Sequence, residues 1–390
     1  MSLSNHQSAN ACRSSAAGAV TRPTRFGKCS RAARFALVTV FTFAAFGRGA
    51  LAQTAQPWPA ADRLFHADPM WLGGDAAYSV DLGAGRVLWL FGDSFVATAP
   101  GQTRRQSAFT RNTIAIERGY DPSRASLRFY WRKQGGKPAS FFPERGANWL
   151  WPIHGVRLGK VLLLFLSVIG SDPDPHSLGF RTVGWTAFLI LNPDREPARW
   201  KLRELEPPAT AWNVIPGASV LREGGFLYVY GFDEPRHDAY LLRLSETAAA
   251  RGRLSDGEWW CGPDRGWMPR NEIKGAPVPV FTGGSTEMSV HFDRRTGRYI
   301  EVESMGFGAT DLALRTAARP EGPWSPPAKV YRPPESDGAD PFVYAGKAHP
   351  ELMGADIVAT YTANGSDERL ASDMTIYFPR FVRINLLPAP

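Results

Sequence analysis

The feature that most restricts the fold is a hairpin pattern that recurs five times along the chain. Each copy has an apolar strand, a tight turn containing Gly or Asp, and a second strand that is more strongly apolar. The copies cover residues 77–94, 152–168, 216–233, 287–305 and 349–364, and their second strands read VLWLF, VLLLF, FLYVY, YIEVE and IVATY. Internal repeats of this size indicate a solenoid, a propeller or an array of small units.

Further strands are expected after each hairpin. Third strands are predicted over 113–117, 187–191, 239–244, 312–316 and 376–384, and fourth strands over 127–131, 199–203, 258–261 and 329–331. Four antiparallel strands per repeat are typical of a propeller blade, so the sequence predicts an all-β, five-bladed β-propeller. We expect residues 63–66 to supply the fourth strand of the last blade and close the ring, because an open ring would expose strand edges. A two-sheet sandwich is the alternative architecture.

The N-terminal segment has the pattern of an export signal. Residues 1–52 contain basic residues but no Asp or Glu, and the apolar run 35–46 is followed by Ala50-Leu51-Ala52. The run is too short to span a bilayer and has the length of a signal-peptide core before a small-x-small cleavage pattern. We therefore expect a signal peptide over residues 1–52, cleavage after Ala52 and a single propeller domain over residues 53–390. The protein is expected to be periplasmic or secreted, without a stable membrane anchor.

Most of the net charge of the chain comes from this N-terminal segment. The net charge of +8 falls to about +1 when the basic residues of the signal are left out. A near-neutral domain does not have the basic surface of a nucleic-acid-binding protein, so we expect no nucleic-acid partner. Cys261 is the one cysteine after the signal, which excludes a disulfide framework and a cysteine-based metal site.

Two carboxylates in the first repeat are the strongest functional signal. The first hairpin turns at residues 83–85, and Asp75 and Asp93 are equally far from the centre of that turn. In a regular hairpin they face each other across the open end, where opposed Cβ atoms lie about 4.5–5.5 Å apart. Two like charges at this distance are destabilising and raise the pKa of one of them, so their presence indicates a ligand or acid–base chemistry. The alternative is that both residues cap turns.

Residues at matching positions of the other repeats should converge on the same face of the ring. Glu287 is a third candidate catalytic carboxylate or a substrate ligand. The side chains expected to bind substrate beside it are Arg111, Asn112, Trp149, Trp151, His349 and Glu351. Glu287 as a strand-edge carboxylate and His349 as a hydrogen-bonded core residue are the alternatives. Glu301 and Glu303 alternate with Val302, which indicates one polar face of a strand and no catalytic role.

This set of residues suits the hydrolysis of glycosidic bonds. One carboxyl group protonates the leaving oxygen, and a second activates water or attacks the sugar. Aromatic rings provide an apolar surface on which sugars stack. We therefore expect a polysaccharide or oligosaccharide as substrate, acid/base catalysis by Asp75 and Asp93, no required cofactor, and a monomer. Nothing in the sequence indicates a central calcium ion, since no loop has the spacing of a calcium site.

Several motifs resemble a known family. Residues 73–82 (GGDAAYSVDL) and 88–95 (LWLFGDSF) resemble the opening of a family of secreted bacterial domains of unknown function, some of whose members are endo-D-arabinanases. Residues 148–152 (NWLWP), 322–325 (GPWS) and 349–351 (HPE) are also similar to motifs of these five-bladed propellers. The resemblance implies that Asp75 and Asp93, at the Gly-Asp positions of the family, are the catalytic pair. It also implies an arabinan-type furanoside as substrate.

Two other functions are compatible with the same pattern. A non-catalytic carbohydrate-binding propeller would keep the aromatic pocket without needing paired carboxylates. A protein-interaction scaffold would bind its partner on the rim and would not bind glycans.

Overall fold

The computed structural model describes residues 52–387, without 211, 235 and 355. Residues 1–51 of the expected signal peptide lie outside the described part of the chain, so cleavage and export stay predictions. None of the helices in the described part is long and apolar enough to cross a membrane.

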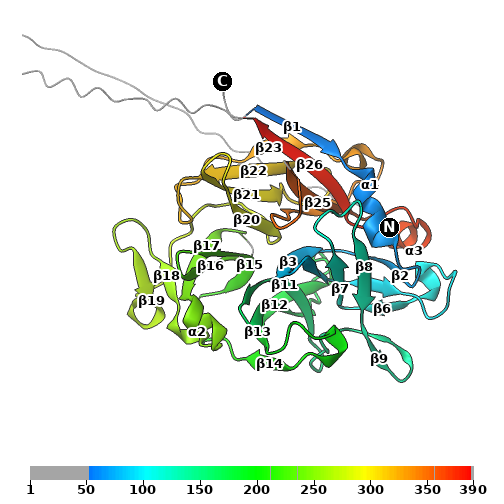
Figure 1. Cartoon of the computed structure of the whole chain (residues 1–390), viewed down its shortest axis with the longest axis horizontal. Coiled ribbons are helices and arrows are strands. Elements are labelled where there is room, and N and C mark those ends of the chain that lie inside the picture. The colour runs from blue at the N-terminus through cyan, green and yellow to red at the C-terminus, as the bar shows by residue number, and fades with distance from the viewer. Residues whose placement is uncertain (1–51, 211, 235, 355, 388–390) are drawn as a thin grey trace, which may run out of the picture. The chain divides into compact units, whose positions relative to one another are not determined.

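Within the described residues, five antiparallel sheets of four or five strands each contain one of the repeats (Figure 1). We number these sheets in chain order. Sheet one consists of β3 (Tyr78–Gly83), β4 (Arg86–Phe91), β7 (Thr113–Arg118) and β8 (Ser126–Tyr130). Sheet two consists of β11 (Trp149–Leu158), β12 (Val161–Ser171), β13 (Phe180–Ile190) and β14 (Leu202–Leu205).

The third and fourth sheets follow the same plan. Sheet three consists of β15 (Val214–Glu223), β16 (Phe226–Asp233), β17 (Ala239–Ser245), β18 (Glu258–Trp260) and an additional strand, β19 (Trp267–Pro269). Sheet four consists of β20 (Met288–Asp293), β21 (Arg298–Ser304), β22 (Leu312–Ala317) and β23 (Ala328–Tyr331). The second strand of each hairpin lies inside its sheet, and in the first two sheets it is mostly apolar on both faces, as expected for a strand covered on both sides.

The fifth sheet is completed by the N-terminal end of the described chain, but by a different segment from the one predicted. It consists of β24 (Val343–Ala348), β25 (Ile357–Ala363), β26 (Arg380–Leu387) and β1 (Ala52–Pro57). The prediction for Arg63–His66 is wrong, because these residues form the 3₁₀ helix η1. Leu64 and Phe65 are adjacent and both buried. Neighbouring residues of a strand would point to opposite faces, whereas a helical turn can bury both.

Two smaller sheets and several short helices connect these elements. The small sheets are formed by β2 (Trp71–Gly74), β5 (Ser94–Val96) and β6 (Ala108–Thr110), and by β9 (Arg132–Gln134) and β10 (Lys137–Ala139). The α-helices are α1 (Pro59–Asp62), α2 (Glu246–Ala250) and α3 (Asp367–Ser372). Further 3₁₀ helices are η2 (Arg104–Gln106), η3 (Pro197–Arg199), η4 (Leu254–Asp256), η5 (Arg270–Glu272) and η6 (Pro334–Asp337).

The sheets pack against one another in chain order through their first strands. Strand β3 contacts β11, β11 contacts β15, β15 contacts β20, and β20 contacts β24. A hydrogen bond between Ser79 of β3 and His349, just after β24, joins the last sheet to the first. The largest hydrophobic cluster draws its residues from sheets one to four.

One polar pattern was misread from the sequence. Glu301 and Glu303 are fully buried rather than exposed on a polar strand face. Both form ion pairs with the buried Arg315 on the neighbouring strand β22. Alternation of charged and apolar residues does not distinguish a solvent-facing strand from one whose charges are paired inside the protein.

Candidate active site

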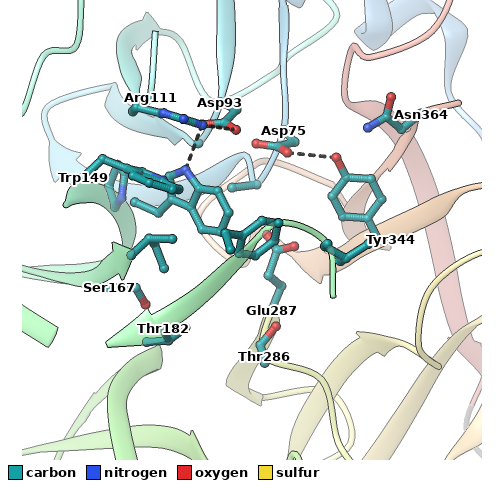
Figure 2. Close-up of a pocket in the computed structure, with 18 of the residues that line it drawn as sticks. Asp75, Asp93, Arg111, Trp149, Ser167, Thr182, Thr286, Glu287, Tyr344 and Asn364 are labelled. Carbon is teal, nitrogen blue, oxygen red and sulfur yellow. Dashed lines mark hydrogen bonds and ion pairs between the residues drawn. The ribbon is translucent and has the colours of Figure 1, made fainter. Parts of the chain in front are cut away.

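Asp75 and Asp93 face each other across the open end of the first hairpin, as predicted. Gly74 lies opposite Ser94 in the pairing of β2 with β5. Continuing this register places Asp75 opposite Asp93, and the Asp75 amide donates a hydrogen bond to the Asp93 carbonyl oxygen (3.4 Å). Figure 2 shows the two carboxyl groups side by side.

The backbone around Asp75 is shaped to present its carboxyl group. Ala76 and Ala77 have φ values of 64° and 52°, which are left-handed conformations that non-glycine residues rarely adopt. Such residues cost on the order of 1 kcal/mol each and cluster at functional sites. Gly92 leaves the necessary space, because a Cβ atom there would lie 2.5 Å from Asp75 Oδ1.

Two tyrosines hold the Asp75 carboxyl group. The hydroxyls of Tyr344 and Tyr377 donate hydrogen bonds to Asp75 Oδ2 at 2.8 and 3.1 Å. Burial, together with the negative charges of Asp93 and Glu287, raises the pKa of Asp75 to about 8, although both tyrosine donors act in the opposite direction. Asp75 therefore keeps its proton at neutral pH.

Asp93 lies beside groups that favour its charged form. The indole Nε1 of Trp151 donates to Asp93 Oδ1 (2.9 Å), and the Arg111 guanidinium lies 3.3 Å from Oδ2. Burial raises the pKa of Asp93 to about 6, and Trp151 and Arg111 limit the increase. The Arg111 guanidinium is itself held over the ring of Trp149, 4.0 Å from its centroid. Asp93 is therefore largely ionised at pH 7, whereas Asp75 is protonated.

Glu287 approaches the pair from the loop before β20. Figure 2 shows its side chain on the opposite side of the pocket from Arg111. Its carboxylate forms an ion pair with Lys347 of β24 (Oε1 to Nζ, 3.3 Å). Burial lowers the pKa of the Lys347 ammonium, while the charges of Glu287 and Asp75 act to raise it.

These carboxylates line a single cavity of about 630 Å³. Six of the nine residues predicted for the site line it: Asp75, Asp93, Arg111, Trp149, Trp151 and Glu287. Aromatic side chains make up much of the wall, namely Phe95, Phe109, Trp149, Trp151, Phe180, Phe307, Phe342, Tyr344 and Tyr377. The arrangement combines an acid, a carboxylate and flat apolar surfaces, which are the components that a sugar-cleaving site requires.

Asn112 was predicted to bind substrate, but it does not line the cavity. Its side chain is fully buried, and its amide nitrogen donates to the carbonyl oxygens of Phe142 (3.0 Å) and Leu150 (2.9 Å). Its amide oxygen accepts from the Phe142 N–H (2.7 Å). Asn112 therefore ties β7 to the segment that leads into sheet two, which is a structural role.

His349 and Glu351 are also placed away from the cavity. The ring nitrogens of His349 hydrogen-bond to the hydroxyls of Ser79 (2.6 Å) and Thr360 (2.8 Å), as expected of a core histidine. Burial raises the pKa of Glu351 to about 7. The prediction was wrong because the first strand of sheet five is β24, so both residues follow the far end of that strand instead of opening it.

Three residues that hold Asp75 or Glu287 were missed in the sequence, namely Tyr344, Lys347 and Tyr377. Tyr344 is near the start of β24, the position that the misplaced fifth repeat left out. A lone lysine in the otherwise apolar strand Val343–Ala348 was an available signal, because lysine is seldom fully buried without a partner. Tyr377 has a φ of 63°, a local conformation that no sequence pattern predicted.

The described residues contain no group of three or more His, Cys, Asp or Glu side chains arranged to hold a metal ion.

Comparison with solved structures shows the fold. A candidate hydrolase from Bacteroides ovatus superposes with a TM-score of 0.67 at 17% sequence identity, over 85% of this chain and 90% of that one. The catalytic domain of a GH62 α-L-arabinofuranosidase from Coprinopsis cinerea gives a TM-score of 0.47 at 10% identity, over 86% of this chain and 98% of that one. A GH43_1 enzyme from Xanthomonas citri, solved with xylotriose, gives a TM-score of 0.43 at 13% identity, over 85% of this chain and 92% of that one.

Sequence comparison places the chain in a family without assigning it an activity. No curated protein matches it. Residues 60–386, which include every residue of the candidate site, match the family described as Domain of unknown function (DUF5005). The chain belongs to the DUF5005 family.

Proposed function

We propose that this protein is a glycoside hydrolase that cleaves a polysaccharide by acid/base catalysis with Asp75 and Asp93. The observation that carries the proposal is the contrast between the two carboxyl groups at the wall of one aromatic cavity. Asp75 is buried beside the negative charges of Asp93 and Glu287 and keeps its proton, whereas Asp93 is held by an indole N–H and a guanidinium and loses it. Pairs of carboxyl groups whose environments separate their pKa values in this way divide the roles of acid and base.

The proposed reaction follows from these charge states. Asp75 donates its proton to the glycosidic oxygen as the bond from that oxygen to the anomeric carbon breaks. Asp93 either accepts a proton from the attacking water or attacks the anomeric carbon itself. In the second case water releases Asp93 in a further step and gives its proton to Asp75. In both routes the products are a new reducing end and a free hydroxyl. Arg111 remains paired with Asp93 and keeps it ionised.

The proposed substrate is an arabinan-type furanoside. The resemblance of residues 73–82 and 88–95 to the opening of a family some of whose members are endo-D-arabinanases supports this choice. The aromatic side chains on several sides of the cavity offer stacking surfaces for more than one sugar ring.

We also propose that the five sheets are the blades of a five-bladed propeller that β1 closes. The one-sheet-per-repeat arrangement, the chain-order contacts of the first strands and the pairing of β1 with β26 support this interpretation. The proposal includes export to the periplasm or the medium after cleavage following Ala52, and a monomeric state.

Incubation of the purified protein with D-arabinan and other defined polysaccharides tests the function. We expect new reducing ends from the wild type, and a loss of about 10²–10⁴-fold in Asp75→Asn and Asp93→Asn. Asp81→Asn is the matched control, because Asp81 lies on the same hairpin but outside the cavity.

Full activity of both Asp75→Asn and Asp93→Asn would contradict the assignment. Glycan binding without release of reducing ends would instead identify a carbohydrate-binding propeller. The absence of any glycan binding would favour a protein-interaction scaffold.

A further inference from the structure

Lys347 is a buried charge that the proposed reaction does not itself use. Its side chain is 1% exposed, and it does not belong to the lining of the cavity. Burying an ammonium group is costly unless it is paired and hydrogen-bonded. The surroundings of Lys347 therefore need a physical explanation.

The three N–H bonds of the ammonium have three oxygen acceptors from three segments. They are the carbonyl oxygen of Ala76, the carbonyl oxygen of Ala345 (2.8 Å) and Oε1 of Glu287 (3.3 Å). The ammonium also lies 4.5 Å from the centroid of the Tyr78 ring, in a cation–π contact. An ammonium donates three hydrogen bonds, so this set saturates it.

The two carbonyl groups belong to the strained residues that adjoin the acid. Ala76 follows Asp75, and Ala345 follows Tyr344, whose hydroxyl donates to Asp75. Both alanines have left-handed conformations, with φ values of 64° and 61°. Strained residues persist only where the surroundings hold them, and Lys347 contacts both.

The charged and titratable groups around Asp75 come from several elements. They are Asp93 just after β4, Glu287 before β20, Tyr344 and Lys347 of β24, and Tyr377 before β26. Lys347 is the cation among them that pairs with Glu287. Without it, the Glu287 carboxylate would face the Asp75–Asp93 pair with no opposite charge beside it.

We propose that Lys347 is a positioning residue, which holds the backbone behind Asp75 and Tyr344 and anchors Glu287 as an ion pair, so that Asp75 can deliver its proton. This inference rests on the proposed function. It assigns Glu287 to the support of the acid rather than to proton donation. It predicts that loss of Lys347 impairs proton delivery more than substrate binding or folding.

The dependence of hydrolysis on the leaving group tests this role. Two substrates are compared, D-arabinan and a 2,4-dinitrophenyl glycoside of an arabinan oligosaccharide, whose leaving group departs without a proton. In Lys347→Met we expect kcat/KM on D-arabinan to fall about 100-fold and kcat/KM on the dinitrophenyl substrate to fall less than about fivefold. The reason is that kcat/KM reports the step in which the leaving group departs, and only D-arabinan needs the acid in that step. The KM for D-arabinan should stay close to that of the wild type.

Lys329→Met is the matched control, since Lys329 is an exposed, ion-paired lysine on the outer strand β23. It should leave both activities unchanged. If Lys347→Met does not fold, the variant Lys347→Met/Glu287→Gln removes both partners of the ion pair and leaves no unpaired buried charge. The same selective loss is expected of it.

Equal losses on both substrates in a folded variant would overturn the inference, because a general distortion of the site would affect both. Unchanged hydrolysis of D-arabinan would overturn it as well. If the wild type cleaves neither substrate, the proposed function fails and the inference falls with it. Wild-type cleavage with an unaffected Lys347→Met variant refutes only the role of Lys347.

Discussion

The indole N–H of Trp151 offers a sharp test of how the site sets the charge of Asp93. Trp151→Phe keeps an aromatic ring in the cavity but removes the hydrogen bond from Nε1 to Asp93 Oδ1 (2.9 Å). A hydrogen bond to a charged group contributes about 1.5–3 kcal/mol. One pKa unit corresponds to 1.36 kcal/mol, so the pKa of Asp93 should rise by about 1–2 units.

The pH profile of kcat/KM reports this change. For the wild type we expect a bell-shaped profile that rises as Asp93 loses its proton near pH 6 and falls as Asp75 loses its proton near pH 8. In Trp151→Phe the acidic limb should move to higher pH, so that the bell-shaped profile becomes narrower. On the acidic side the rate should therefore fall about tenfold or more at a given pH.

Trp149→Phe is the matched control for this experiment. Trp149 lies two residues away on β11 and also lines the cavity. In contrast to Trp151, its Nε1 has no hydrogen-bond partner among the described residues. Its substitution should leave the acidic limb where it is in the wild type. Acidic limbs at the same pH in both variants would refute the idea that the indole N–H sets the ionisation of Asp93.

Three further predictions concern space, charge and closure. Gly92→Ala should abolish activity without unfolding the protein, because its Cβ would lie 2.5 Å from Asp75 Oδ1, whereas Gly184→Ala, with open space around it, should behave like the wild type in the same assay. Because the folded-state pKa of Asp75 is raised to about 8, wild-type stability should decline as pH rises from about 4 to 8. At pH 8 the free energy of unfolding of Asp75→Asn should therefore exceed that of the wild type by about 1 kcal/mol or more, which raises its melting temperature, with little difference at pH 4. An unchanged or lower melting temperature at pH 8 would contradict the assigned ionisation. Deletion of residues 52–57 should lower the melting temperature and promote aggregation through the uncovered edge of β26, and native stability of the shortened chain would argue against closure by β1.

The sequence was most informative where the relevant pattern is local. The distance of Asp75 and Asp93 from one tight turn predicted that they oppose each other, because the register of a hairpin follows from its turn. The apolar second strands of the repeats were also recognisable from a local pattern, because a strand covered on both faces has few polar residues. Trp149 and Trp151 followed from their place at the start of a repeat.

The rest depended on how distant segments meet. The second strand of the fifth repeat was predicted where β25 lies, but its first strand was expected to begin at residue 349 and is instead β24. This error placed His349 in the expected cavity and left out Tyr344. The alternation around Val302 predicted one polar face for Glu301 and Glu303, but it could not show that this face is buried, because their partner Arg315 is on another strand.

The sequence by itself determined four of the five hairpins, the second strand of the fifth, and the opposition of Asp75 and Asp93. Turn spacing and alternation are short-range properties of the chain. Only the tertiary structure decided which of the two carboxyl groups keeps its proton. That choice depends on the burial of Asp75 beside the charges of Asp93 and Glu287, and on the donors Trp151 and Arg111 beside Asp93. These groups reach the pair from separate parts of the chain. The pKa of a carboxyl group is set by burial and by charges and donors within a few ångströms, and these are properties of the assembled fold.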